Sequence, residues 1–239
     1  MERVLVIDHS TLVIRRATAV ILGALLVAGA AQVSVPLPGT PVPMTLQPMA
    51  VLLVGGLLGA RLGALSMILY LAMGAVGLPV FTPTVPLLGV ARLLGPTGGY
   101  LLAYPVAAWV AGWFANPGRQ PGANETVAYG PSSRKETVAY GQPSRRETVA
   151  YGQPRADVLE NPGLPPGVSQ NPWLRTTLGV FAGLALIHLG GLAQLTILTG
   201  DVLVSAQLAT WPFLVGDLLK LAILVPVLTK LTPAVRARL

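Results

Sequence analysis

Long apolar stretches recur along this chain, and each is close to the length of a helix that crosses a lipid bilayer. They lie at 17–35, 46–60, 63–80, 97–115, 174–198 and 208–230. A helix needs roughly 20 mostly apolar residues to cross the hydrocarbon core of a membrane. The pattern therefore predicts an all-α, polytopic membrane protein with six transmembrane helices.

The Lys and Arg residues are concentrated in alternate links between these stretches. With six spans, one side of the membrane carries Arg3, Arg15, Arg16, Arg61, Arg119, Arg134, Lys135, Arg145, Arg146, Arg155, Arg175, Lys230, Arg236 and Arg238, and the other side carries only Arg92. Cytoplasmic links carry an excess of basic residues, so we expect both termini to be cytoplasmic. A basic pair before the first stretch also fits a secretory signal peptide, but the five later stretches make a retained helix the simpler interpretation.

The link at 116–173 differs in composition from the rest and divides the chain into three parts. Residues 1–115 hold the first four predicted helices, and 174–239 hold the last two helices and a tail. Within the link, ETVAYG begins at 125, 136 and 147, and each repeat is followed by Gly- or Pro-containing breaks. Such breaks exclude the helical supercoil that an 11-residue period would otherwise favour. We expect a flexible, low-complexity cytoplasmic loop. A regulatory or partner-docking tract is the functional alternative to a passive insertion.

The overall composition supports a membrane protein and excludes several other classes. Hydrophobic residues make up 53% of the chain and charged residues only 10%, against about 25% charged in soluble domains. There is no cysteine, which excludes disulfides, cysteine-based zinc sites and thiol catalysis. His9 and His188 are far apart in the sequence and make a weak case for a metal site. The net charge of +7 resides in the links, so we expect contact with membrane lipid and not with nucleic acid.

Two links on the side opposite the basic residues are unusually apolar. They read VPLPGTPVPMT at 35–45 and PVFTPTVPLLGVARLLGPTGG at 79–99. Proline and glycine at this density prevent regular helix. Irregular apolar backbone is tolerated near a membrane where it is buried in protein or lines a cavity. We therefore expect both links to fold over something.

Apart from Arg175 and Lys230 at the ends of their stretches, only two charged residues, Asp217 and Lys220, lie inside a predicted span. Their spacing places them on one helix face, and a charge within a membrane helix usually faces a cavity or a partner. One interpretation is that they simply neutralise each other. The other is a ligand site, because an aspartate accepts N–H bonds and a lysine holds a carboxylate. Such a pair suits a small molecule with an amide-like end and an acidic end.

Several motifs in the apolar part, taken together, resemble one known family. They are VPLPGTPVPMTLQPMAVLLVGGLLGARLGA at 35–64, YLAMGAVGLPVF at 70–81, GPTGGYLLAYPVAA at 95–108, GLAQLTILTG at 191–200 and WPFLVGDLLK at 211–220. In this order and spacing they resemble the biotin-transporter substrate-binding family of the BioY type, which are the specificity subunits of energy-coupling-factor transporters.

The resemblance implies a fold, a ligand and a set of contacts. It implies six membrane helices and high-affinity capture of biotin from the outer side of a prokaryotic plasma membrane, with no other cofactor. It also implies that Asp217 and Lys220, which match the acidic and basic residues of the family's last helix, contact biotin. The link after the third helix contributes in that family too. Here the match is looser, since TPTVPLLGVARLL replaces a stretch that is often Gly-rich, and Arg92 is the candidate there.

Partners follow from the same resemblance. The 239 residues contain no GxxxxGK[ST] phosphate loop, so energy would come from a transmembrane coupling protein and two cytoplasmic ATPase subunits. Ala24 and Ala28 form a small-xxx-small face that lets another helix approach. We expect it to dock a membrane partner, and internal packing is the alternative.

Other functions stay open at this point. They are uptake of another small carboxylate-bearing vitamin, an intramembrane enzyme that uses Asp217 or His188, and a ligand-free assembly protein. The sequence contains neither an HExxH spacing nor a nucleophile–base pair, and this argues against an enzyme.

Overall fold

The first apolar stretch forms one long helix, α1 (His9–Gln32), which begins earlier than predicted. It therefore includes Arg15 and Arg16 in its first turns. The computed structural model describes residues 9–115, 171–237 and 239. The repeat tract lies outside these residues, so its predicted loop character stays a prediction.

A short hairpin and two short helices follow α1. Strands β1 (Ser34–Val35) and β2 (Met44–Thr45) pair antiparallel, with Ser34 opposite Thr45. Helices α2 (Gln47–Leu58) and α3 (Ala60–Ala75) are joined at Gly59, whose φ of 87° is in the left-handed region that favours glycine. The hairpin closes the first apolar link.

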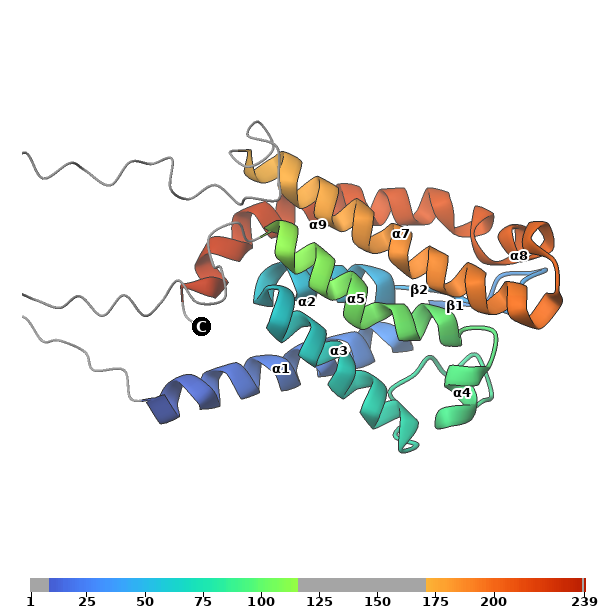
Figure 1. The fold of residues 1–239 in the computed structure, drawn as a ribbon, viewed down its shortest axis with the longest axis horizontal. Helices are drawn as coiled ribbons and strands as arrows, with labels where there is room; N and C mark the ends of the chain where they lie inside the picture. Colours follow the sequence, from blue (N-terminus) through green and yellow to red (C-terminus); the bar gives the residue numbers. More distant parts are fainter. Residues whose placement is uncertain (1–8, 116–170, 238) are drawn as a thin grey trace, which may run out of the picture.

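The remaining elements complete the bundle. They are α4 (Val90–Leu94), α5 (Gly98–Ala115), α7 (Pro172–Thr199), α8 (Val202–Ala209), the 3₁₀ turn η2 (Trp211–Phe213) and α9 (Leu214–Arg236). Helix α5 is central and packs against α2, α3, α7 and α9. The start of α1 and the end of α9 lie at one end of the bundle, and α4, α8 and the hairpin lie at the other (Figure 1).

The described helices differ in their ability to cross a membrane. By length and composition, three helical segments qualify: Ser10–Gln32, Pro172–Thr199 and Val202–Arg236. Helices α2 and α3 are apolar but shorter, with 12 and 16 residues. Because an α-helix rises about 1.5 Å per residue, a helix as short as α2 does not by itself cross a hydrocarbon core of about 30 Å. The chain is thus a multi-pass membrane protein, and its described residues are all-helical apart from the two-residue strands. Its outer faces are apolar, and the exposed residues include Ile21, Leu25, Leu65, Ile68, Phe181, Leu189 and Leu219.

The last predicted helix, 208–230, is corrected by the structure. A break at Thr210 separates α8 from α9, and the proline of η2 follows at position 212. Proline lacks the N–H that would continue the helical ladder. As a result Asp217 lies in the first turn of α9 and not about two turns inside it.

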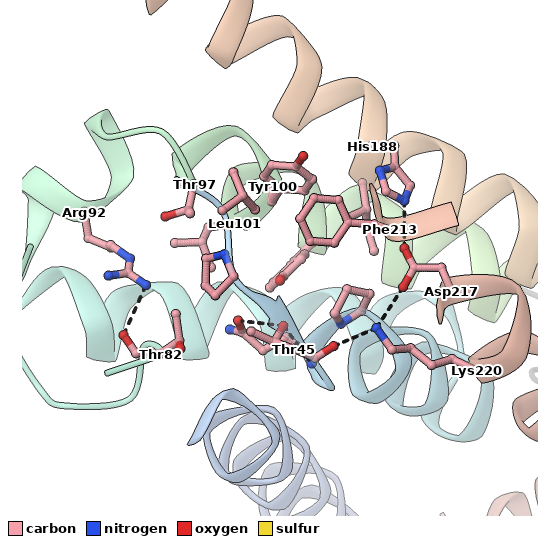
Figure 2. Close-up of a pocket in the computed structure, with 16 residues that line it drawn as sticks. Thr45, Thr82, Arg92, Thr97, Tyr100, Leu101, His188, Phe213, Asp217 and Lys220 are labelled. Atoms are coloured by element: carbon pink, nitrogen blue, oxygen red, sulfur yellow. Dashed lines mark hydrogen bonds and ion pairs between the residues drawn. The ribbon is translucent and has the colours of Figure 1, made fainter. Parts of the chain in front are cut away.

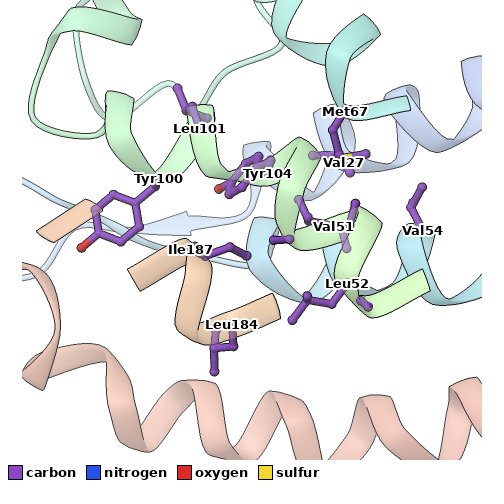
Figure 3. Close-up of a cluster of buried hydrophobic side chains, with 14 of the residues drawn as sticks. Val27, Val51, Leu52, Val54, Met67, Tyr100, Leu101, Tyr104, Leu184 and Ile187 are labelled. Atoms are coloured by element: carbon purple, nitrogen blue, oxygen red, sulfur yellow. The ribbon is translucent and has the colours of Figure 1, made fainter. Parts of the chain in front are cut away.

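Small residues allow α2, α3 and α5 to approach closely, next to the buried hydrophobic side chains of the core that Figure 3 shows. A Cβ on Gly55 would lie 2.3 Å from the Ala108 carbonyl oxygen, and one on Gly63 would lie 2.7 Å from the Gly55 Cα. Membrane helices associate through such contacts, because burial against lipid supplies no hydrophobic driving force.

The same kind of packing involves the two alanines of α1 that were expected to dock a partner. Ala24 is fully buried and Ala28 is 8% exposed, and both belong to the hydrophobic core of this chain. Helix α1 packs there against α2 and α3. Beside Ala24, a Cβ on Gly23 would meet the Ser66 hydroxyl at 2.7 Å. In this chain the small-residue face therefore serves internal packing, and docking of a membrane partner through these two alanines stays a prediction.

We predict that Gly55→Ala destabilises the protein, because the added methyl group overpacks the contact with α5. Overpacking costs about 1–3 kcal/mol, and thermal unfolding in detergent would report a lower midpoint. Gly29→Ala is the matched control, since a Cβ there meets no atom within 4 Å. An equal loss of stability in both variants would contradict the packing argument.

Candidate functional site

A pocket lies at the end of the bundle that carries the hairpin, α4 and α8, and it is lined from six parts of the chain. The lining residues are Val42, Pro43, Thr45, Gln47, Pro48, Thr82, Arg92, Thr97, Tyr100, Leu101, Tyr104, Ile187, His188, Phe213, Asp217 and Lys220 (Figure 2). Both apolar links contribute to it, which confirms that they fold over one interior site.

One end of the pocket is built around Asp217, which is 3% exposed. Its Oδ1 accepts from Lys220 Nζ at 2.8 Å, and its Oδ2 is 2.8 Å from His188 Nε2 of α7. Lys220 Nζ also donates to the Thr45 carbonyl oxygen at 2.8 Å. The two charges predicted to share a face therefore do pair, and they do so at the pocket wall.

This end keeps unused hydrogen-bonding capacity. A carboxylate offers about four lone-pair sites and an ammonium three donors. The hydrogen bonds just described use one site on each Asp217 oxygen and two of the Lys220 donors. The pair can therefore accept and donate further bonds to a polar ligand.

Arg92 occupies the other end of the pocket (Figure 2). It is 1% exposed, and its guanidinium donates to the carbonyl oxygens of Val85, at 2.6 Å, and Thr82, at 3.1 Å. Its Nε is buried without a hydrogen-bond partner, and within the described part of the chain no acidic side chain forms an ion pair with it. Burial lowers the pKa of Arg92 from its ordinary value, since desolvation disfavours the charged form. A buried cation of this kind favours an anionic partner.

Between the two charged ends the walls are largely apolar. Leu101, Ile187 and Phe213 line the pocket together with Pro43 of the first link and Pro48 of α2. Tyr100 donates its hydroxyl to the Ala209 carbonyl of α8, and Gln47 Nε2 donates to the Tyr70 hydroxyl at 2.6 Å. These hydrogen bonds thus hold the aromatic and amide groups of the pocket wall in place against the helices of the bundle.

Polar side chains fix the two links over the pocket. Thr40 Oγ1 of the first link donates to the Leu208 carbonyl at 2.5 Å. Gln194 Nε2 donates to the carbonyls of Leu93, at 3.2 Å, and Gly95, at 3.1 Å. Buried backbone carbonyls need such partners, and these side chains supply them where the backbone forms no regular hydrogen-bond ladder.

The structure adds residues that the sequence did not assign to the site. His188, considered from the sequence for a metal site or as a catalytic group, contacts the aspartate of the candidate site. Thr97 and Tyr104 line the same pocket. Thr97 belongs to the GPTGGYLLAYPVAA motif at 95–108, but only the packing of the link against α5 places it beside the pocket.

Fold and site together define a class: an all-helical integral membrane protein with a small-ligand pocket at one end of its bundle, between two charged groups. The profile of the BioY family matches residues 5–237, and the chain belongs to this family.

Curated relatives and one solved structure are similar to it. A probable biotin transporter BioY of Pyrococcus horikoshii is 49% identical over 82 residues, which cover 34% of this chain and 48% of the relative. The biotin transporter BioY of Thermotoga maritima is 45% identical over 92 residues, covering 38% and 52%. The aligned part thus spans about half the length of these relatives.

The crystal structure of the S-component for biotin from an ECF-type ABC transporter has the same fold. It superposes with a TM-score of 0.64 at 22% identity and covers 92% of each chain.

Proposed function

We propose that this chain is a biotin-binding membrane subunit that mediates biotin uptake, energised by partner subunits. One observation carries the proposal: a single pocket has at one end the buried Arg92, which has no acidic partner among the described residues, and the Asp217–Lys220 pair at the other. The membership of the BioY family and the names of the curated relatives support biotin as the ligand.

The chemistry of biotin suits this arrangement. Its ureido ring has two N–H donors and one carbonyl acceptor, its thiophane is apolar, and its valerate tail ends in a carboxylate. In the proposed pose Asp217 accepts the ureido N–H groups and Lys220 donates to the ureido carbonyl. Because the two side chains contact each other, they serve the same end of the ligand. The carboxylate of biotin, at the other end of the ligand, then binds Arg92.

Charge balance also favours a monoanion. Asp217 and Lys220 cancel, and Arg92 leaves one positive charge in the pocket when His188 is neutral. A ligand with a single carboxylate neutralises that charge. Another small carboxylate-bearing vitamin satisfies the Arg92 end equally, so the ureido end is what selects biotin.

The topology is part of the proposal. All six long apolar segments, including α2 and α3, lie within the membrane, with both termini and the 116–170 tract on the cytoplasmic side. The start of α1 and the end of α9 at the same end of the bundle support this. The pocket then opens toward the outer side.

Energy comes from other proteins in this proposal, and the chain is not an enzyme. The sequence has no phosphate loop of the GxxxxGK[ST] type. From the resemblance of this chain to the family, we expect the partners to be a transmembrane coupling protein and two cytoplasmic ATPase subunits.

We expect both single changes at the charged pair to weaken biotin binding. Asp217→Asn leaves Lys220 uncompensated, and Lys220→Met keeps the stem but removes the ammonium. Loss of one partner of a buried charged interaction costs about 2–5 kcal/mol, or roughly 30- to 4,000-fold in affinity. Biotin titration and thermal unfolding of wild type, both singles and the double variant separate the interpretations. A double variant that binds as tightly as wild type would make the pair a structural neutralisation.

We expect biotin methyl ester to bind more weakly than biotin to the wild-type protein. The ester removes the charge assigned to Arg92 and keeps the ureido ring. The affinity ratio should again be about 30-fold or more, measured by titration calorimetry in detergent. Biotinidase-free buffers and a non-hydrolysable biotin amide control for hydrolysis. Equal affinities for acid and ester would place the carboxylate outside the Arg92 end.

A tag inserted within 125–152 should stay inaccessible to membrane-impermeant labels in intact cells and become labelled after permeabilisation. A tag in the 36–43 link is the control for an outer position. Labelling of the 125–152 tag in intact cells would reverse the proposed orientation.

A further inference from the structure

Thr97 lies at the Arg92 end of the pocket, in the turn between α4 and α5. It is 7% exposed, and its Oγ1 is buried without a hydrogen-bond partner in the described residues. Figure 2 shows its hydroxyl on the same side of the pocket as the Arg92 guanidinium. A buried hydroxyl without a partner is costly, so its position indicates a ligand group.

Thr97 directly precedes α5, a helix of 18 residues. Its carbonyl accepts from the Leu101 N–H at 3.4 Å, which marks the first turn of that helix. A threonine in this place usually turns its hydroxyl onto the free N–H groups of the first turn. Here the hydroxyl makes no such bond and remains available to the pocket.

The two glycines after Thr97 seat this helix start tightly. A Cβ on Gly98 would lie 1.8 Å from the Leu93 carbonyl oxygen, and one on Gly99 would lie 2.0 Å from the Gly190 carbonyl oxygen. The turn is therefore held between α4 and α7, and Thr97 has little freedom to move away. The positive end of the α5 dipole lies at the same place and favours negative charge.

We propose that the Thr97 hydroxyl, at the N-terminus of α5, donates to the ligand carboxylate beside Arg92 and thereby determines specificity for the acid. This inference rests on the proposed function. A carboxylate has two oxygens and about four lone-pair sites, so Arg92 Nε and Thr97 Oγ1 can be satisfied together. The role is direct contact with the ligand, and it distinguishes the acid from its neutral esters and amides.

The test compares two ligands on the full chain in detergent. Thr97→Val keeps the shape and removes the donor, and Thr97→Ser keeps the donor. Thr84→Val is the matched control, because the Thr84 hydroxyl pairs with Thr82 of the same link. Each protein is titrated with biotin and with biotin methyl ester, and its thermal unfolding is recorded without ligand.

The expected result is selective. Thr97→Val should lower biotin affinity about 10- to 100-fold, as for a hydrogen bond to a charged group, and change ester affinity by less than about threefold. Thr97→Ser and Thr84→Val should stay close to wild type for both ligands. If Thr97→Val lost affinity equally for acid and ester, Thr97 would have a packing role. If it lost affinity for neither, Thr97 would make no contact with the ligand. Either result would overturn the inference.

The same data separate this inference from the proposed function. If wild type prefers biotin over the ester and Thr97→Val keeps that preference in full, the inference fails and the proposed function stands. If wild type binds no biotin, the proposed function fails and the inference with it.

Discussion

The arrangement of the pocket depends on the burial of one carboxylate, Asp217, in an otherwise apolar bundle. An ionised carboxylate away from water needs charged or hydrogen-bonding partners, and it receives one from α9 itself and one from α7, at 2.8 Å each. Lys220 extends the contact to the carbonyl of Thr45 in β2. Two long helices and the hairpin are thereby fixed relative to one another at the pocket wall.

The second buried charge has a different environment. Arg92 is surrounded by carbonyl oxygens of its own link and has no acidic partner in the described chain. Its link is in turn fixed by amide and hydroxyl groups from α1, α3 and α7. A neutralised end and an unneutralised end therefore face each other across apolar walls, and this asymmetry favours a ligand with one acidic end.

Much of the fold could be predicted from apolar segment length, because only helices of that length satisfy their backbone inside a membrane. The predicted stretch 97–115 differs from α5 by one residue at its start. Predictions failed, or left two alternatives open, where local breaks or packing decide. The break at Thr210 moved the start of the last helix, and the 24/28 alanine spacing fits internal and external packing equally, so the sequence could not say which side of α1 they face.

For the site, the sequence by itself determined that Asp217 and Lys220 share a helix face, and it predicted that they face a cavity or a partner, because a charge in an apolar helix is costly. It also determined that two proline-rich links must cover something. Only the tertiary structure decided that His188, Arg92 and Thr97 lie around the same pocket. These residues are far apart in the chain, and their approach depends on how α5, α7 and α9 pack, which no local pattern encodes.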